Sequence, residues 1–176
     1  HFKTRESPSK KRKTQDKAWM DHLQEPYRLI SRMMIFYGLQ VDEVVNIRIH
    51  DIDTDQRLLT VRDALNSDTQ LLIDETLLPA IKLQLKKSAI QREHDIKSGE
   101  VSVEHPFKPH LTQKDQWYFL FPGTLQYNIQ TQTKLRESID AKAANCAIEQ
   151  AQSHYFKAQA LLEFNQQHGK NKKAMY

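Results

Sequence analysis

The sequence predicts an α+β domain that is mainly helical and carries a small antiparallel β-sheet. Apolar residues recur at three- and four-residue intervals over much of the 176-residue chain, which is typical of amphipathic helices. Two short apolar runs, 58–61 and 70–73, flank a polar stretch and predict a β-hairpin over about 57–73. A hydrophobic fraction of 39% permits a packed core, and the length suits one domain with or without a tail.

Two helices are predicted before the hairpin, preceded by a helical pattern at 19–23. Pro26 suits the first turn of the longer helix, because a residue there has no helical partner for its N–H group. Gly38 is placed to end this helix, and Asp42 marks the start of a second, short helix near residue 41. Residues 51–56 then read as a turn. The apolar face of the first helix is expected to consist of Leu29, Ile30, Met33, Met34 and Tyr37.

After the hairpin, a long helix is expected over about 76–97, capped by Asp74 or Thr76. Its inward face is predicted to contain Leu77, Leu78, Ile81, Leu85 and Ile90. Residues 98–116 carry one glycine and two prolines and are predicted to form a loop.

The remaining chain is predicted as one strand followed by helices. Residues 117–121 are apolar and are expected to form a short strand that Pro122 and Gly123 stop. Helices are expected over about 131–148 and 154–166.

The positive charge is confined to the two ends of the chain. The formal net charge is +4, but residues 1–17 hold seven basic and two acidic residues, which is +5. Residues 170–176 hold three lysines and no acid, so residues 18–169 carry −4. The run at 7–13 is either an arm for DNA phosphates or a solvated linker to something upstream. The chain begins at His1, which suggests a fragment of a longer protein.

The sequence offers few standard motifs for metal or cofactor chemistry. The series Asp51, Asp53, Asp55 imitates half of a calcium loop, but Gln56 and Arg62 stand where that loop needs Gly and Glu. The single Cys146 and the scattered histidines, His94, His105 and His110 among them, match no zinc spacing. No apolar run is long enough for a membrane helix. We therefore expect a cytoplasmic protein with no metal, cofactor, membrane contact or small-molecule substrate.

One stretch carries a recognisable pattern. Residues 37–43 read Tyr-Gly-Leu-Gln-Val-Asp-Glu, and residues 47–53 read Ile-Arg-Ile-His-Asp-Ile-Asp and lead into the hairpin. With their flanks, at 35–62, they resemble the opening of the catalytic domain of tyrosine recombinases, also called phage integrases. The segment 117–122, Trp-Tyr-Phe-Leu-Phe-Pro, is similar to one in the integron-integrase branch, which has an insertion before it.

The resemblance implies a fold and a domain plan. It implies a recombinase-like helical bundle with the small sheet over 18–176, in which 98–116 is the insertion-like loop. Residues 1–17 would then be the basic, flexible linker or tail that follows the family's N-terminal DNA-clamping domain, which this chain lacks. The similarity is strong over about 26–122 and weak over 123–176.

The resemblance also implies a chemistry, DNA strand exchange, whose residues are mostly replaced here. In the family a tyrosine attacks a phosphodiester to form a 3′-phosphotyrosine, while two arginines, a lysine and histidines stabilise charge and move protons. The positions map onto Gln40 for the first arginine, Leu65 for the lysine, and Gln150 and Ser153 for the His-x-x-Arg pair. The retained residues are the acid Glu43, the final histidine His168 and the nucleophile Tyr176. Since losing one preorganised charge donor typically costs about 10² to 10³ in rate, the resemblance predicts an inactive homologue.

Three functions remain open. The first is a non-catalytic module that binds double-stranded DNA through its basic ends, at Lys10, Lys11, Arg12, Lys13, Lys170, Lys172 and Lys173. The second is a protein-interaction module that self-associates through its C-terminal segment. The third is an active site-specific recombinase that uses Tyr176, with arginines outside the expected positions.

Overall fold

The computed structural model describes residues 18–62, 68–99, 101–102, 104–105, 108–112, 118–129 and 132–173. The helices are η1 (Ala18–His22), α1 (Tyr27–Tyr37), α2 (Val41–Val45), η2 (Ile49–Asp51), α3 (Leu78–Ser98) and α4 (Ala141–Lys173). The strands are β1 (Ile52–Asp53), β2 (Leu58–Val61), β3 (Thr69–Leu72), β4 (Val101–Ser102), β5 (Glu104–His105), β6 (Lys108–Thr112), β7 (Pro122–Asn128) and β8 (Thr133–Ser138). The α+β class is therefore confirmed.

The first half of the chain folds largely as its pattern predicts, except that residues 52–53, which lie in a predicted turn, form the strand β1. Pro26 lies at the N-cap of α1, and Gly38 ends the helix in the left-handed conformation, with its N–H donating to the Met34 carbonyl. Strands β2 and β3 pair antiparallel with Leu58 opposite Leu72, and β1 extends this sheet. The short helix near residue 41 is α2.

Helix α3 is confirmed, but its N-cap is Leu77, with no side-chain cap, so the predicted cap by Asp74 or Thr76 is wrong. Its buried face is also largely polar. Leu77 and Ile81 are buried as predicted, whereas Ile90 is 60% exposed, so its predicted inward position is wrong. The buried positions are instead Gln84, Ser88 and Asp95. These side chains bond to the segment that α3 covers, and such bonds repay the cost of burying them.

Most predictions for the second half are wrong. Within 98–116 the described residues form the strands β4, β5 and β6 instead of a loop. Residues 118–121, part of the predicted strand, form only a single bridge between Phe119 and Arg48, and Pro122 begins the strand β7 instead of ending one. Residues 133–138, which lie in a predicted helix, form the strand β8, because the chain makes a hairpin with β7 there. The two C-terminal helices are one, α4, because 141–168 contains neither Gly nor Pro to break it.

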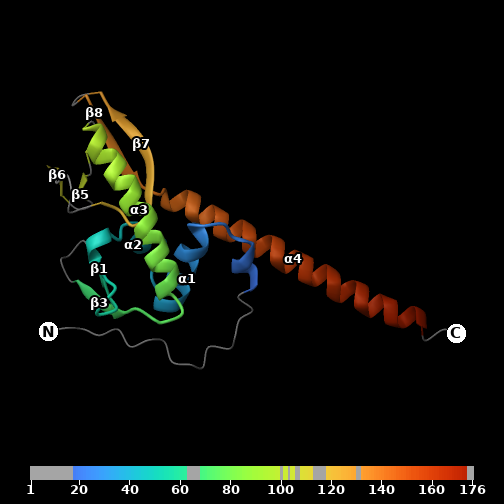
Figure 1. The fold of residues 1–176 in the computed structure, drawn as a ribbon. Helices are drawn as coiled ribbons and strands as arrows, with labels where there is room; N and C mark the ends of the chain where they lie inside the picture. Colours follow the sequence, from blue (N-terminus) through green and yellow to red (C-terminus); the bar gives the residue numbers. More distant parts are fainter. Residues whose placement is uncertain are drawn as a thin grey trace.

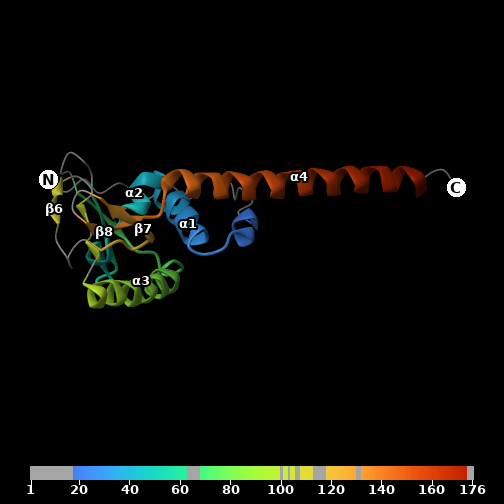
Figure 2. The ribbon, with the colours of Figure 1, turned by 90° about the horizontal axis from the view of Figure 1, so that it is seen from above.

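The core lies where α1, α2, α3, the first sheet and the start of α4 meet (Figure 1). A second sheet, in the order β4-β8-β7, stands beside α3, and β5 pairs with β6. Helix α4 packs its first turns on η1, α1 and α2 and then runs out from this body as a single helix (Figures 1 and 2).

The segment 118–121 passes through the centre of the body and is bonded on both sides. The Ile49 N–H donates to the Tyr118 carbonyl at 2.9 Å, and the Leu120 N–H donates to the Ile47 carbonyl at 2.8 Å. On the other side the Leu120 carbonyl accepts from the side chains of Gln84, at 2.9 Å, and Ser88. The segment thereby joins α3 to the chain that follows α2.

A buried ion pair holds β8 against α3. Arg136 donates to both carboxylate oxygens of Asp95, at 2.8 and 2.7 Å, and to the Gly123 carbonyl at 2.9 Å. The Tyr118 hydroxyl donates to the same carboxylate at 2.7 Å. Burial alone would raise the pKa of Asp95, but the hydrogen bonds from Arg136, Tyr118 and Gln91 hold it below its usual value.

We expect Asp95→Asn to lower the free energy of unfolding by about 3–5 kcal/mol at neutral pH, because it leaves the buried guanidinium of Arg136 without a counter-charge. The matched control is Glu93→Gln, which breaks only the exposed pair with Lys97 and should cost less than about 0.5 kcal/mol. Urea unfolding measures both.

The pH dependence gives an independent check. A carboxyl whose folded-state pKa is lowered stabilises the fold above its unfolded pKa of about 3.9, and the effect is lost as the pH falls through the folded-state value. The stability gap between the unmodified chain and Asp95→Asn should therefore narrow below about pH 4. A gap that is constant from pH 7 to pH 3 would contradict this role for Asp95.

Candidate functional site

The start of α2 is the position at which the resemblance places the first catalytic arginine and the retained acid. Gln40 is the N-cap of α2, and its side chain accepts from the backbone N–H of Glu43. In return the Glu43 carboxylate accepts from the Gln40 N–H at 2.8 Å. This reciprocal pair is a capping box, which satisfies two backbone donors that the first turn leaves without helical partners. Both side chains thus stabilise a helix end.

The arginine of the second motif is part of the core. Arg48 is fully buried, with its guanidinium 3.4 Å from the centre of the Phe119 ring. Its backbone N–H donates to Asp51 at 2.9 Å, and Asp51 also binds Arg62 at 2.7 Å. Burial lowers the pKa of Arg48 to about 9, although the charge of Asp51 opposes this shift, so the guanidinium stays charged at neutral pH.

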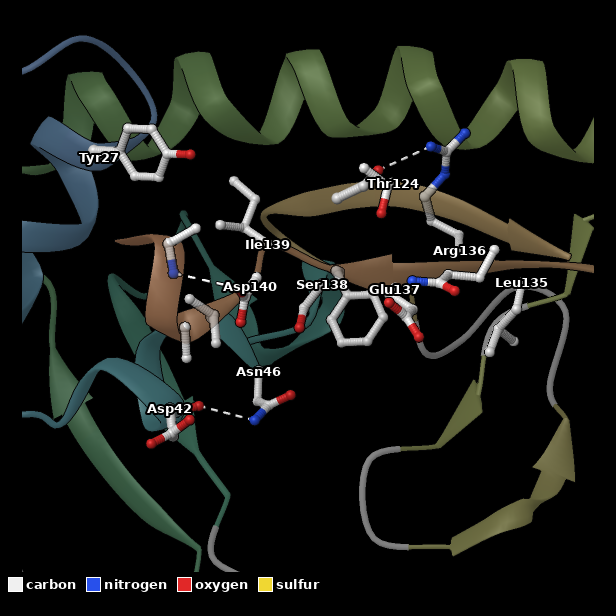
Figure 3. Close-up of a pocket in the computed structure, with 16 residues that line it drawn as sticks. Tyr27, Asp42, Asn46, Thr124, Leu135, Arg136, Glu137, Ser138, Ile139 and Asp140 are labelled. Atoms are coloured by element: carbon white, nitrogen blue, oxygen red, sulfur yellow. Dashed lines mark hydrogen bonds between the residues drawn. The ribbon is translucent and has the colours of Figure 1, made fainter. Parts of the chain in front are cut away.

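A cavity of about 730 Å³ opens between α2, the β7–β8 hairpin and the start of α4 (Figure 3). Asp42 and Asn46 line it from α2, while Glu137 and Asp140 line it from β8 and the residues after it. Arg136 also borders the cavity, but its guanidinium already binds Asp95 and the Gly123 carbonyl. The other charged side chains that line this cavity, Asp42, Glu137 and Asp140, are carboxylates, which repel a DNA phosphate and favour cations.

The other residues carried over from the recombinase pattern lie apart from this cavity or outside the described side chains. Gln150 and Ser153 are exposed on α4, and Gln150 lines a second cavity of about 660 Å³ between α4 and η1. His168 lies on α4, but its side chain is outside the described part, as are those of Lys170, Lys172 and Lys173. The positions of Lys10, Lys11, Arg12, Lys13, Leu65 and Tyr176 fall outside the described residues altogether.

Sequence reasoning missed the residues that organise this cavity. Asp140 caps α4, because its carboxylate accepts from the N–H groups of Lys142 and Ala143. A signal for it existed, since Asp140 directly precedes an alanine-rich helical run. No such local signal marks the pair of Asp95 and Arg136, which are 41 positions apart in the chain.

In comparisons with known proteins, no protein-family model and no curated protein matches the sequence. Among the residues that the structure describes, no cluster of three or more His, Cys, Asp or Glu side chains is arranged to hold a metal ion. Within the same part of the chain, none of the helices has the length and apolar character needed to cross a membrane.

We expect Glu43→Ala to lower the free energy of unfolding by about 1 kcal/mol, because it removes one of the two bonds of the capping box. Asp42→Ala, at the neighbouring position, leaves both bonds in place and should cost no more than about 0.5 kcal/mol through the helix dipole. Thermal unfolding of the two variants decides the matter. If Glu43→Ala unfolded at the same temperature as the unmodified chain, the capping bond of Glu43 would not contribute to stability.

Proposed function

We propose that this chain is a DNA-tethering module of the tyrosine-recombinase type that does not carry out strand exchange. The observation that supports it best is the capping box at Gln40 and Glu43. The recombinase reaction needs a fixed cation at the first of these positions, where it binds the phosphate oxygens. Here an uncharged side chain occupies that position and is engaged by the helix backbone.

The distribution of charge supports binding through the ends of the chain. Residues 18–140 carry a net charge of −4, and carboxylates line the cavity beside α2. The attraction to phosphates must then come from the +5 segment at 1–17 and from the three lysines at 170–173. Helix α4 carries these three lysines to its far end, away from the acidic body (Figure 1). A helix C-terminus also favours cations through its dipole.

Duplex binding should therefore weaken steeply with salt, by roughly 0.9 log units in affinity per log unit of salt for each phosphate neutralised. Replacing Lys170, Lys172 and Lys173 with Gln should lower this slope, and so should replacing Lys10, Lys11, Arg12 and Lys13. Fluorescence anisotropy with a labelled duplex at several salt concentrations measures the slopes. The matched control replaces Lys82, Lys86 and Lys87 on α3 with Gln, which removes the same charge from the body and should leave the slope unchanged. Absence of binding at 50 mM salt would overturn the proposal.

An assay that traps a covalent protein–DNA adduct distinguishes the proposed module from an active recombinase. A duplex with a nick near the scissile phosphate traps the 3′-phosphotyrosyl intermediate of this chemistry, because the cleaved end diffuses away. We expect no adduct on a denaturing gel. An adduct that disappears in Tyr176→Phe would establish the active enzyme and refute the loss of strand exchange.

A further inference from the structure

Strand β7 forms one margin of the second sheet and carries exposed apolar side chains. The strand order is β4-β8-β7, and among the described residues β8 is the only strand that pairs with β7. Leu125 and Tyr127 on this strand are 43% and 60% exposed, and Ile129, directly after it, is 81% exposed. The far end of the β7–β8 hairpin projects away from α1 and α4 (Figure 1), so the margin is accessible there.

The exposed apolar side chains lie on the α3 side of the hairpin, away from the acidic cavity. Leu125 pairs with Arg136, whose guanidinium binds Asp95 on α3. Figure 3 shows Arg136 and Glu137 on opposite sides of the hairpin, as successive residues of a strand must be. Neither the cavity nor the proposed DNA tethering therefore accounts for this apolar surface, since phosphates bind cations and hydrogen-bond donors.

The margin lacks the charges and prolines that commonly keep a free sheet edge from pairing. Residues 123–129 contain no charged side chain and no proline. The irregular pairing near Pro122 affects only the beginning of the strand. Lysines, prolines and inward-pointing charges are the usual means of blocking such an edge, and an edge without them pairs with another extended strand. The outer edge of β7 is thus built to receive a strand.

The residues of β7 match those of a second β7 strand. We propose that two copies of this chain associate by pairing their β7 strands antiparallel, with the two-fold axis at Gln126. In this register Gln126 lies opposite the second copy's Gln126, and Leu125 lies opposite the second copy's Tyr127. The second sheets of the two copies then form one sheet in the order β4-β8-β7-β7-β8-β4. An interface of this kind is isologous and closes at the dimer.

The cross-strand pairs of this register favour a second copy as the occupant. The two Gln126 amides each carry a donor and an acceptor, so they bond to each other across the axis. An aliphatic–aromatic pair lies on either side of them, which is a stabilising combination between neighbouring strands. Thr124 lies opposite the second copy's Asn128, so each pair joins two polar or two apolar side chains. One strand thus supplies both halves of a matched interface.

The charges of the chain do not oppose this pairing at close range. Each copy carries +4 in total, so the contact itself must be free of like charges. The nearest cations beside it are Lys134, opposite Tyr127, and Arg136, which Asp95 already neutralises. Lys134 and the second copy's Arg136 are three strand spacings apart, about 14 Å at 4.7–4.9 Å each. This exceeds the Debye length of about 8 Å at physiological ionic strength.

The chain's single cysteine makes a crosslinking test clean. In a Cys146→Ser background, Gln126→Cys should form a disulfide-linked dimer under mild oxidation, seen on a non-reducing gel. Directly opposed residues of antiparallel strands have Cβ atoms about 4.5–5.5 Å apart, which is near disulfide range. The control is Thr124→Cys, whose two copies would lie four residues apart along the strands, about 14 Å, and should not crosslink. Equal crosslinking of both variants would indicate another register and overturn the proposal.

Sedimentation velocity without DNA tests the association itself. We expect a concentration-dependent dimer whose dissociation constant rises at least tenfold in Gln126→Lys, because this change places two like charges directly opposite each other. Gln70→Lys makes the same change at an exposed position of β3, the margin of the first sheet, and should change the constant by no more than twofold. Thermal unfolding checks that both variants are folded.

Two results would overturn the proposed pairing. A monomer at all micromolar concentrations would mean that the edge of β7 does not receive a second copy. Association that Gln126→Lys leaves unchanged would place the interface elsewhere. Neither result bears on DNA tethering, because the measurements contain no DNA.

Discussion

The buried segment 118–121 is the constraint on which the rest of the body depends. Its backbone pairs with the chain after α2, while its Leu120 carbonyl binds two side chains of α3. Because buried backbone groups must be hydrogen-bonded, this one segment determines where α3 lies relative to α2 and the first sheet. The polar face of α3 follows from the same need, since apolar side chains there would leave the Leu120 carbonyl with fewer donors.

The same constraint positions the second half of the fold. Tyr118 and Arg136 meet on the carboxylate of Asp95, so the segment, β8 and α3 share one buried charge network. Gly123 lets β7 and β8 approach closely at their open end, because a Cβ at this position would collide with the Ser138 backbone. Directly after β8, Asp140 caps α4, and the helix leaves the body from that point. The direction of α4 thus depends on the hairpin that precedes it and on its packing against η1, α1 and α2.

The residues of the recombinase-like pattern serve the fold in this chain. Arg48 and Asp51 hold the turn between α2 and the first sheet, and Gln40 and Glu43 hold the start of α2. In this chain these four side chains therefore have structural roles that do not depend on any recombinase chemistry.

The sequence by itself determined the elements whose signals are local. Gly38 ends α1, the apolar runs form the β2–β3 hairpin, and periodicity placed α3, because helix caps and strand alternation depend on neighbours in the chain. Tertiary structure alone decided the β7–β8 hairpin, the polar face of α3 and the pairing of Asp95 with Arg136. These depend on partners that are distant in sequence, such as Leu120 for Ser88. The course of α4 lies between the two. The absence of Gly and Pro from residues 141–168 permits a single helix, but only the tertiary structure leaves Phe156, Leu161 and Leu162 exposed on it.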